Sequence, residues 1–323
     1  MSDMDYVYAV ARIRSKELSL FSDAVMEQLL ARPDYEACVS FLLEKGWGGA
    51  DTPRDGEAIL AKEREKTWAD IRELTPDMSV FQFLDYTNVF HNLKAAVKEV
   101  CTGTKVEHIY YKDTKPSAEE ILAAVREKDF DALPGYMAEA AREAFQTLLH
   151  TKDGQLCDMI VDRAALEAVY EAGQKSKAPV IRDYAEAFVA SADIRIAARC
   201  QKTGKTESFI RRALAPCAAL SVEELARAAA AGEQELTAYL KSTAYAGAAD
   251  ALGVSQSEFD RWCDNQVIEA MKPQKYNPFS VGPLVAYALA RENEIKTVRI
   301  ILSGKRTGMP EASIRERVRE MYV

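Results

Sequence analysis

The residues best suited to bind a nucleotide are Thr203-Gly204-Lys205-Thr206, which resemble the end of a phosphate-binding loop. Such a loop needs a glycine five positions before the Gly-Lys pair, because its backbone N–H groups must approach the phosphates closely. Arg199 occupies that position, and no apolar strand precedes it. We therefore interpret this segment as the end of a helix followed by a polar turn, and we predict no nucleotide site.

Residues that could bind a metal ion or act in catalysis are few and scattered. The six cysteines contain no Cys-x-x-Cys pair, and the three histidines, His91, His108 and His150, are isolated, so no zinc-site spacing is present. Asp158 and Asp162 share one helix face, which a solvated surface explains better than a cation site. The Asp-Asp-x-x-Asp and Gly-x-Ser-x-Gly patterns are also absent. We predict no catalytic residue, no metal and no cofactor.

The composition restricts the classes of partner and of fold. The 323 residues include 42 Lys and Arg against 50 Asp and Glu, a net charge of −8, which disfavours a nucleic-acid partner. Only 15 residues are glycine, which disfavours turn-dense all-β folds. No stretch approaches 18 uncharged apolar residues, so we expect no membrane-spanning helix.

Most of the chain has the periodicity of α-helices. Three Ser-x-x-Glu capping boxes begin at Ser117, Ser221 and Ser255, where each hydroxyl can accept from a free backbone N–H. Residues 310–321 place apolar side chains on one face and predict a terminal helix. The strand-like run at 105–111 is too short and isolated to build a sheet. The predicted fold class is all-α.

A repeated triplet indicates internal triplication. Asn92-Leu93-Lys94, Asp193-Ile194-Arg195 and Glu294-Ile295-Lys296 stand 101 residues apart, and we call them the signature triplets. Their predicted helices span 83–103, 184–204 and 284–304. The first two end in Thr-Gly, where glycine can adopt the left-handed conformation of a helix cap, whereas Gly304 comes one residue early. We predict three similar helical-bundle domains, 1–110, 111–215 and 216–323, about a pseudo-threefold axis.

The signature cations Lys94, Arg195 and Lys296, with Arg299 and Arg306 of the basic C-terminal stretch, are the candidate partner-contact residues. One interpretation is surface ion pairing or solvation, which contributes little to stability. The other places the signature cations on equivalent faces around a shared concavity, where they meet an acidic partner. Repeat identity alone does not show which face binds.

Four segments carry a resemblance to a known family. These are YVYAVARIR at 6–14 and the stretches 84–103, 182–204 and 277–310. The last contains Pro278-x-x-x-Gly282, a helix with Tyr287, Arg291 and Glu292, and a closing Gly308-Met309-Pro310. Over its whole length the chain resembles the C subunit of bacterial and archaeal V/A-type rotary ATPases, the counterpart of the eukaryotic d subunit.

The resemblance implies a non-catalytic adaptor shaped as a funnel of three helical domains. Its implied partners are the D and F subunits of the central stalk and the membrane proteolipid ring, with no small-molecule substrate. The socket would link ATP hydrolysis or synthesis in other subunits to H⁺ or Na⁺ transport. The implied location is cytoplasmic and peripheral to the membrane through the complex.

Two other functions are alternatives: a generic helical-repeat scaffold that binds a protein, and an all-α metal-dependent enzyme. Solenoid repeats have periods of about 34–47 residues, and the 101-residue period argues against the scaffold. The absence of clustered carboxylates argues against the enzyme.

The missing phosphate-binding loop generates a prediction about the isolated chain. We expect it neither to bind nor to hydrolyse ATP, as measured by calorimetric titration and by phosphate release. Mg²⁺-dependent turnover that persists through repurification would contradict this expectation.

Overall fold

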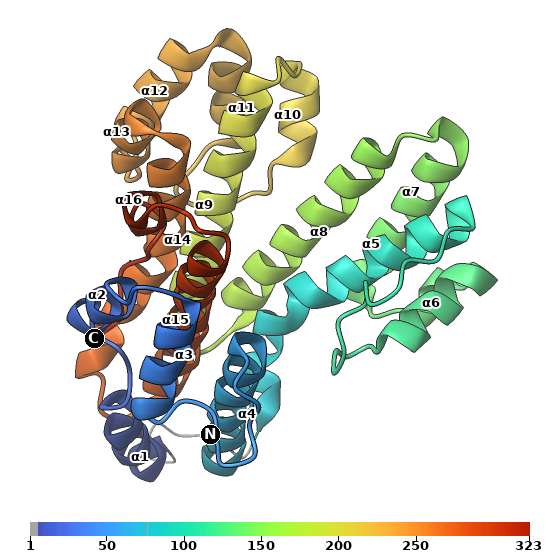
Figure 1. Ribbon diagram of the computed structural model, residues 1–323. Coiled ribbons are helices and arrows are strands. Elements are labelled where there is room, and N and C mark those ends of the chain that lie inside the picture. Colours follow the sequence, from blue (N-terminus) through green and yellow to red (C-terminus); the bar gives the residue numbers. More distant parts are fainter. Residues whose placement is uncertain (1–5, 76) are drawn as a thin grey trace. The chain divides into compact units, whose positions relative to one another are not determined.

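The computed structural model describes residues 6–75 and 77–323, and within these ranges it contains helices and no strand (Figure 1). Helices account for 74% of the chain, which confirms the all-α prediction. The chain forms two compact units. Unit 1 comprises Met1–Met78, Lys177–Ala187 and Gly247–Val323, and unit 2 comprises Ser79–Ser176 and Phe188–Ala246. The division into three domains about a threefold axis stays a prediction.

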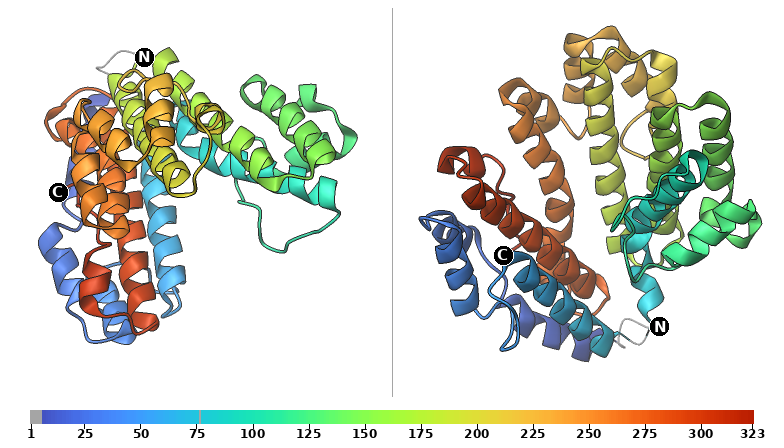
Figure 2. Two further views of the ribbon diagram at one scale, coloured as in Figure 1. Left: turned by 90° about the horizontal axis from the view of Figure 1, so that it is seen from above. Right: turned by 45° about the vertical axis from the view of Figure 1, so that its right-hand side comes forward.

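Unit 1 is built around one long buried helix, α15 (Gly282–Arg306). Its other helices are α1 (Val7–Glu17), α2 (Asp23–Leu30), α3 (Tyr35–Glu44), α4 (Gly56–Leu74), α13 (Gly247–Val254), α14 (Gln256–Met271), η4 (Lys272–Tyr276) and α16 (Glu311–Arg315). The N-terminal helices α1, α3 and α4 pack on α15, so the two ends of the sequence share one core (Figure 2). Helix α4 contributes Ile59, Glu63, Thr67 and Ile71, buried at four-residue intervals.

Unit 2 contains the helices η2 (Met78–Asp85), α5 (Tyr86–Thr102), α6 (Ala118–Glu127), η3 (Phe130–Ala132), α7 (Gly135–Thr151), α8 (Gly154–Lys175), α9 (Pro179–Lys202), α10 (Glu207–Ala213), α11 (Val222–Ala231) and α12 (Glu233–Lys241). Its main core lies between α5, α6, α7 and α8, with α7 and α8 antiparallel to each other (Figure 1). Helix α9 begins in unit 1, and its residues from Phe188 onward belong to unit 2.

The predicted helix ends are largely those of the structure. Gly103 and Gly204 have φ of +69° and +63°, as expected of glycine caps. The capping box at Ser117 is complete. At Ser221 the hydroxyl accepts from Glu224 as predicted, but the Ser221 N–H donates to Tyr239 Oη instead of the glutamate.

Two predicted details differ at the C-terminus. Helix α15 continues through Gly304 to Arg306. The glycine at 304 lets Ile314 pack closely on the helix, because an added Cβ would stand 2.6 Å from the Ile314 side chain. The predicted terminal helix over 310–321 is shortened to α16. Beyond α16, side-chain oxygens replace helix carbonyls as acceptors for the backbone N–H groups. Asn265 Oδ1 accepts from Glu320 N, and Asp23 Oδ1 accepts from Met321 N, each at 3.0 Å.

The glycine caps predict a selective effect of alanine. Replacing Gly103 or Gly204 by alanine should lower the free energy of unfolding by about 1 kcal/mol, because an L-residue is strained at positive φ. No neighbouring atom lies within 4 Å of an added Cβ at either site. The matched control is Gly154→Ala, which also has open space but lacks a positive φ. Denaturant unfolding tests this, and equal losses in all three variants would contradict the cap argument.

Candidate functional site

The three signature triplets lie within helices α5, α9 and α15. Their middle residues, Leu93, Ile194 and Ile295, are core residues. The first member of each triplet is polar and is also buried, since Asn92, Asp193 and Glu294 are 0%, 1% and 1% exposed. A polar group buried to this extent must find hydrogen-bond partners in the protein.

Asn92 finds its partners in the irregular segment that follows α5. The backbone N–H of Tyr111 donates to Asn92 Oδ1 at 2.8 Å, and Asn92 Nδ2 donates to the Tyr111 carbonyl at 3.0 Å. The same Nδ2 donates to Thr114 Oγ1 at 3.1 Å. His91, one residue earlier, lies 3.0 Å from the Ile109 carbonyl through Nε2. The amide thus attaches this segment to the helix.

Asp193 has the same role in α9. The backbone N–H of Ala215 donates to Asp193 Oδ1 at 3.1 Å. Burial raises the pKa of Asp193 to about 8, although this N–H and the charge of Arg163 act in the opposite direction. The carboxyl group is therefore largely protonated at neutral pH.

Glu294 is the third member, in α15. Its Oε1 accepts from the backbone N–H of Phe21, and its Oε2 accepts from Arg291 in an ion pair with both side chains buried. Arg291 also donates to Ser19 Oγ at 2.9 Å, and its guanidinium lies 5.6 Å from the Trp47 ring. Burial raises the pKa of Glu294 to about 7, although Arg291 acts in the opposite direction.

The three residues share one function within the fold: each accepts a hydrogen bond from a backbone N–H outside its own helix. We call Asn92, Asp193 and Glu294 the buried anchors. Sequence reasoning weighed the cations of the triplets and missed these anchors. The available signal was a polar residue at the same position in each repeat, beside a core Leu or Ile.

The signature cations have three different environments. Lys94 forms an ion pair with Asp162 at 2.7 Å, and Lys98 one turn later forms one with Asp158 at 2.6 Å. The i,i+4 aspartates predicted for a solvated face therefore join α8 to α5. Arg195 is half-buried. Lys296 is exposed, and within residues 6–75 and 77–323 the Lys296 side chain forms no ion pair and no hydrogen bond.

The other two candidate cations lie on the same face of α15 as Lys296. Arg299 forms a bidentate pair with Glu57 of α4 through Nε and Nη2, both at 3.0 Å. The Arg306 guanidinium lies 4.8 Å from the Tyr35 ring. Lys296, Arg299 and Arg306 thus share a stripe in unit 1, while Lys94 and Arg195 belong to unit 2. Their contact with a partner stays a prediction.

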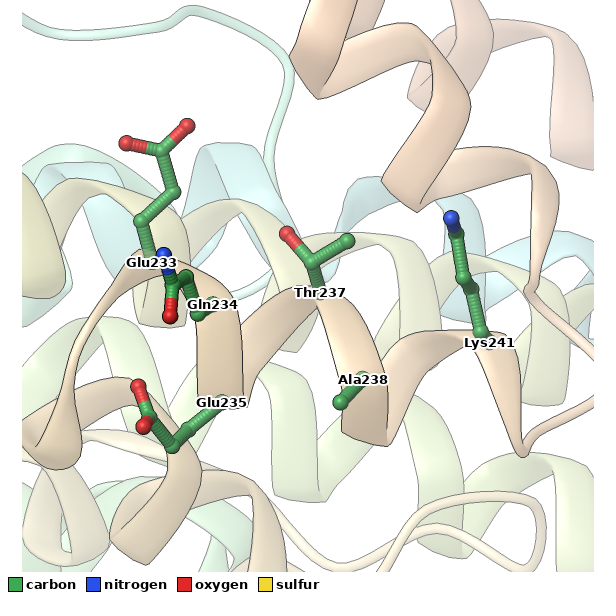
Figure 3. Close-up of a pocket in the computed structure, with 6 residues that line it drawn as sticks. All are labelled: Glu233, Gln234, Glu235, Thr237, Ala238 and Lys241. Atoms are coloured by element: carbon green, nitrogen blue, oxygen red, sulfur yellow. The ribbon is translucent and has the colours of Figure 1, made fainter.

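Two hollows mark the surface of unit 2. One lies over α12 and is lined by Glu233, Gln234, Glu235, Thr237, Ala238 and Lys241, all from that helix (Figure 3). The other is a groove along α7 and α8, whose rim carries Arg163–Glu167 and Lys175–Glu171 ion pairs. Both are surface features with charged walls whose lining comes from helices within one unit.

The described part of the chain has two further properties. Within residues 6–75 and 77–323, no group of three or more His, Cys, Asp or Glu side chains is placed to hold a metal ion. In the same ranges, no helix is both long and apolar enough to cross a membrane.

Together these features define an all-helical protein in which buried polar residues and ion pairs join the helices. The chain belongs to the ATP synthase (C/AC39) subunit family, whose profile matches residues 9–317. It is 24% identical to the C subunit of the V-type sodium ATPase of Enterococcus hirae, over 99% of both chains. It is 22% identical to the C subunit of the V-type ATP synthase of Thermus thermophilus, over 97% of this chain and 98% of that one. It is 23% identical to the C subunit of the A-type ATP synthase of Methanocaldococcus jannaschii, over 96% and 85%.

The anchors predict a pH dependence of stability. Because the pKa of Asp193 is higher in the folded protein than in the unfolded chain, folding retains a proton that unfolding releases. The free energy of unfolding should therefore fall as pH rises from about 4 to about 8, by up to about 1.4 kcal/mol per pH unit for this group. Asp193→Asn should remove this contribution, as measured by denaturant unfolding between pH 5 and pH 8.

Asn92, the buried anchor of α5, supplies the matched variant for this test. Asn92→Asp places a buried carboxyl group where the protein has an amide, so the free energy of unfolding of this variant should fall more steeply with rising pH than that of wild type. Parallel pH profiles of wild type, Asp193→Asn and Asn92→Asp would contradict the assignment.

Proposed function

We propose that this chain is the C subunit of a rotary V/A-type ATPase, a non-catalytic adaptor between the rotating central stalk and the membrane proteolipid ring. The observation that carries the proposal is the family match over residues 9–317. Relatives that are named as C subunits of V-type complexes match nearly the whole chain as well. This match favours the adaptor over a generic repeat scaffold and over a metal-dependent enzyme.

Such an adaptor must pass torque between two partners without chemistry of its own. Dense helical packing suits this task because protein interiors are poorly compressible. The buried anchors support the same role, since each ties a helix to a remote segment by hydrogen bonds that are costly to break in the interior. The adaptor links ATP hydrolysis or synthesis elsewhere in the complex to H⁺ or Na⁺ transport, and the complex holds it peripherally at the cytoplasmic side of the membrane.

The proposed partners are the D and F subunits of the stalk and the proteolipid ring. The exposed Lys296 is the candidate cation best placed to reach a carboxylate of the stalk. Arg195 and Arg306 are further candidates. Lys94 and Arg299 form ion pairs with Asp162 and Glu57, which they must exchange to bind the stalk. Such exchange limits their contribution to binding.

The experiment is assembly of the complex with and without this chain. Addition of the chain should restore binding of the D–F stalk to the ring and ATP-driven ion transport. A complex that couples ATP hydrolysis to transport equally well without the chain would overturn the proposal.

The signature cations form a second arm of the same experiment. Reversal of Lys94, Arg195 and Lys296 to glutamate should weaken stalk association, by about 1.5–3 kcal/mol per desolvated contact or under about 1 kcal/mol per exposed one. Circular dichroism should show an unchanged helix content. Lost folding without a separate binding defect would assign these residues to internal structure, and unchanged binding would assign them to a solvated surface.

A further inference from the structure

The residues that follow α16 belong to unit 1 but to none of its helices. The last hydrogen bond of a helical turn is donated by the Val318 N–H, and within the described residues no backbone–backbone hydrogen bond involves residues 319–323. Met321 and Tyr322 are nevertheless only 3% and 2% exposed. Residues 316–323 therefore lie on unit 1 as a separate peptide would, and we call them the docked segment.

Side chains of three helices bind the main chain of the docked segment. Asn265 of α14 accepts from the Glu320 N–H at 3.0 Å, and Asn293 of α15 donates to the Glu320 carbonyl at 2.9 Å. Asp23 of α2 accepts from the Met321 N–H at 3.0 Å, which holds this end of the chain beside α2 (Figure 1). Because these bonds go to main-chain atoms, they fix the position and the direction of the segment.

The charged side chains of the docked segment meet opposite charges in a fixed order. Arg319 donates through Nε to Asp264 Oδ2 at 2.8 Å, and Lys272 donates to Glu320 Oε1 at 2.6 Å. A segment with its two charges exchanged would place a carboxylate beside Asp264 and a cation beside Lys272. Like charges repel when they are juxtaposed, so the site selects a basic residue followed by an acidic one.

The next two side chains of the segment supply apolar burial. Met321 joins the core cluster to which α2, α3, α4 and α15 contribute. Tyr322 lies with its ring centroid 5.1 Å from Lys275 Nζ, and burial raises the pKa of its hydroxyl. Burial of an apolar and an aromatic side chain provides the affinity that surface ion pairs alone do not.

The docked segment can leave its site without the loss of a helix. Its contacts are side-chain hydrogen bonds, two ion pairs and two buried side chains, and none of them is part of the internal bonding of a helix. Ile314 holds α16 on α15 separately, because it packs against the backbone at Gly304. A segment held in this way opens at a lower free energy than the whole domain.

We propose that unit 1 contains a peptide-binding site and that the docked segment is its intramolecular ligand, which leaves and rebinds as one piece. The ligand class is an extended peptide with a basic, an acidic, an apolar and an aromatic residue in succession, as in Arg319-Glu320-Met321-Tyr322. Release of the segment exposes the side chains of α2, α14 and α15 that bind it. This exchange occurs in the isolated chain, so it is independent of the proposed function.

The first test is native-state hydrogen exchange on the full chain, measured by NMR. The amides of Glu320 and Met321 should have protection factors at least about tenfold lower than those of Ile295 and Val298 in α15, with a weaker dependence on denaturant. Added salt should lower them further, because it screens the ion pairs of the segment. Equal protection and equal denaturant dependence would show that the segment opens only when the protein unfolds, and would overturn the proposal.

The second test asks whether the site accepts the same peptide from solution. Full-length chain with Met321→Glu and Tyr322→Glu combined should release its own segment, and a fluorescent synthetic peptide of residues 316–323 should then bind at one equivalent. Wild type should bind this peptide at least about tenfold more weakly, because its own segment competes at a high effective concentration. The matched control is Val323→Glu, since Val323 is 39% exposed in the same segment, and it should behave as wild type.

A peptide with Arg319→Glu and Glu320→Arg tests the order of the charges, and it should bind the double variant at least about tenfold more weakly than the natural sequence. Equal binding of the two peptides, or no binding of either to a double variant that keeps its helix content, would overturn the peptide site. Loss of helix content in the double variant, measured by circular dichroism, would also overturn the proposal, since the segment could not then leave an intact unit.

Discussion

A polar side chain buried in a helical core is costly unless it finds hydrogen-bond partners in the protein, and much of this structure follows from that constraint. Asn92, Asp193 and Glu294 meet it with backbone N–H groups of Tyr111, Ala215 and Phe21. An apolar residue in their place would pack in several ways, whereas a hydrogen bond fixes which segment lies against the helix and at which residue. The anchors therefore specify how each long helix is attached to a distant part of the chain.

The surface follows a different rule, because many of its charges form ion pairs with neighbouring side chains. Pairs such as Lys94–Asp162, Arg299–Glu57 and Arg64–Glu292 join adjacent helices within one unit. Each contributes little alone, but together they reduce the number of isolated charges that could attract a wrong partner. A protein that works within a larger assembly benefits from this arrangement, since specificity then depends on fewer unpaired groups.

Features governed by local physics were predictable from the sequence. The all-α class, the left-handed glycines at 103 and 204 and the capping box at Ser117 depend on residues close together in the chain. The anchors were not predicted, because burial of Asn92 or Glu294 is decided by segments far away in the sequence. The prediction of a terminal helix over 310–321 was wrong for the same reason. Asn265 and Asp23 accept from backbone N–H groups that a longer helix would have used. Local pattern thus specifies the helices and several of their caps, while distant polar partners decide where the terminal helix ends.

The C-terminal residues Met321 and Tyr322 are buried, and Met321 N donates to Asp23 near the other end of the sequence. Unit 1 also needs α15, on which α1, α3 and α4 pack. During synthesis the chain emerges from its N-terminus, so α1–α4 leave the ribosome long before the helix on which they pack. The segments of unit 2 are complete earlier. The order of translation therefore leaves the apolar faces of α1–α4 uncovered until α15 has been synthesised.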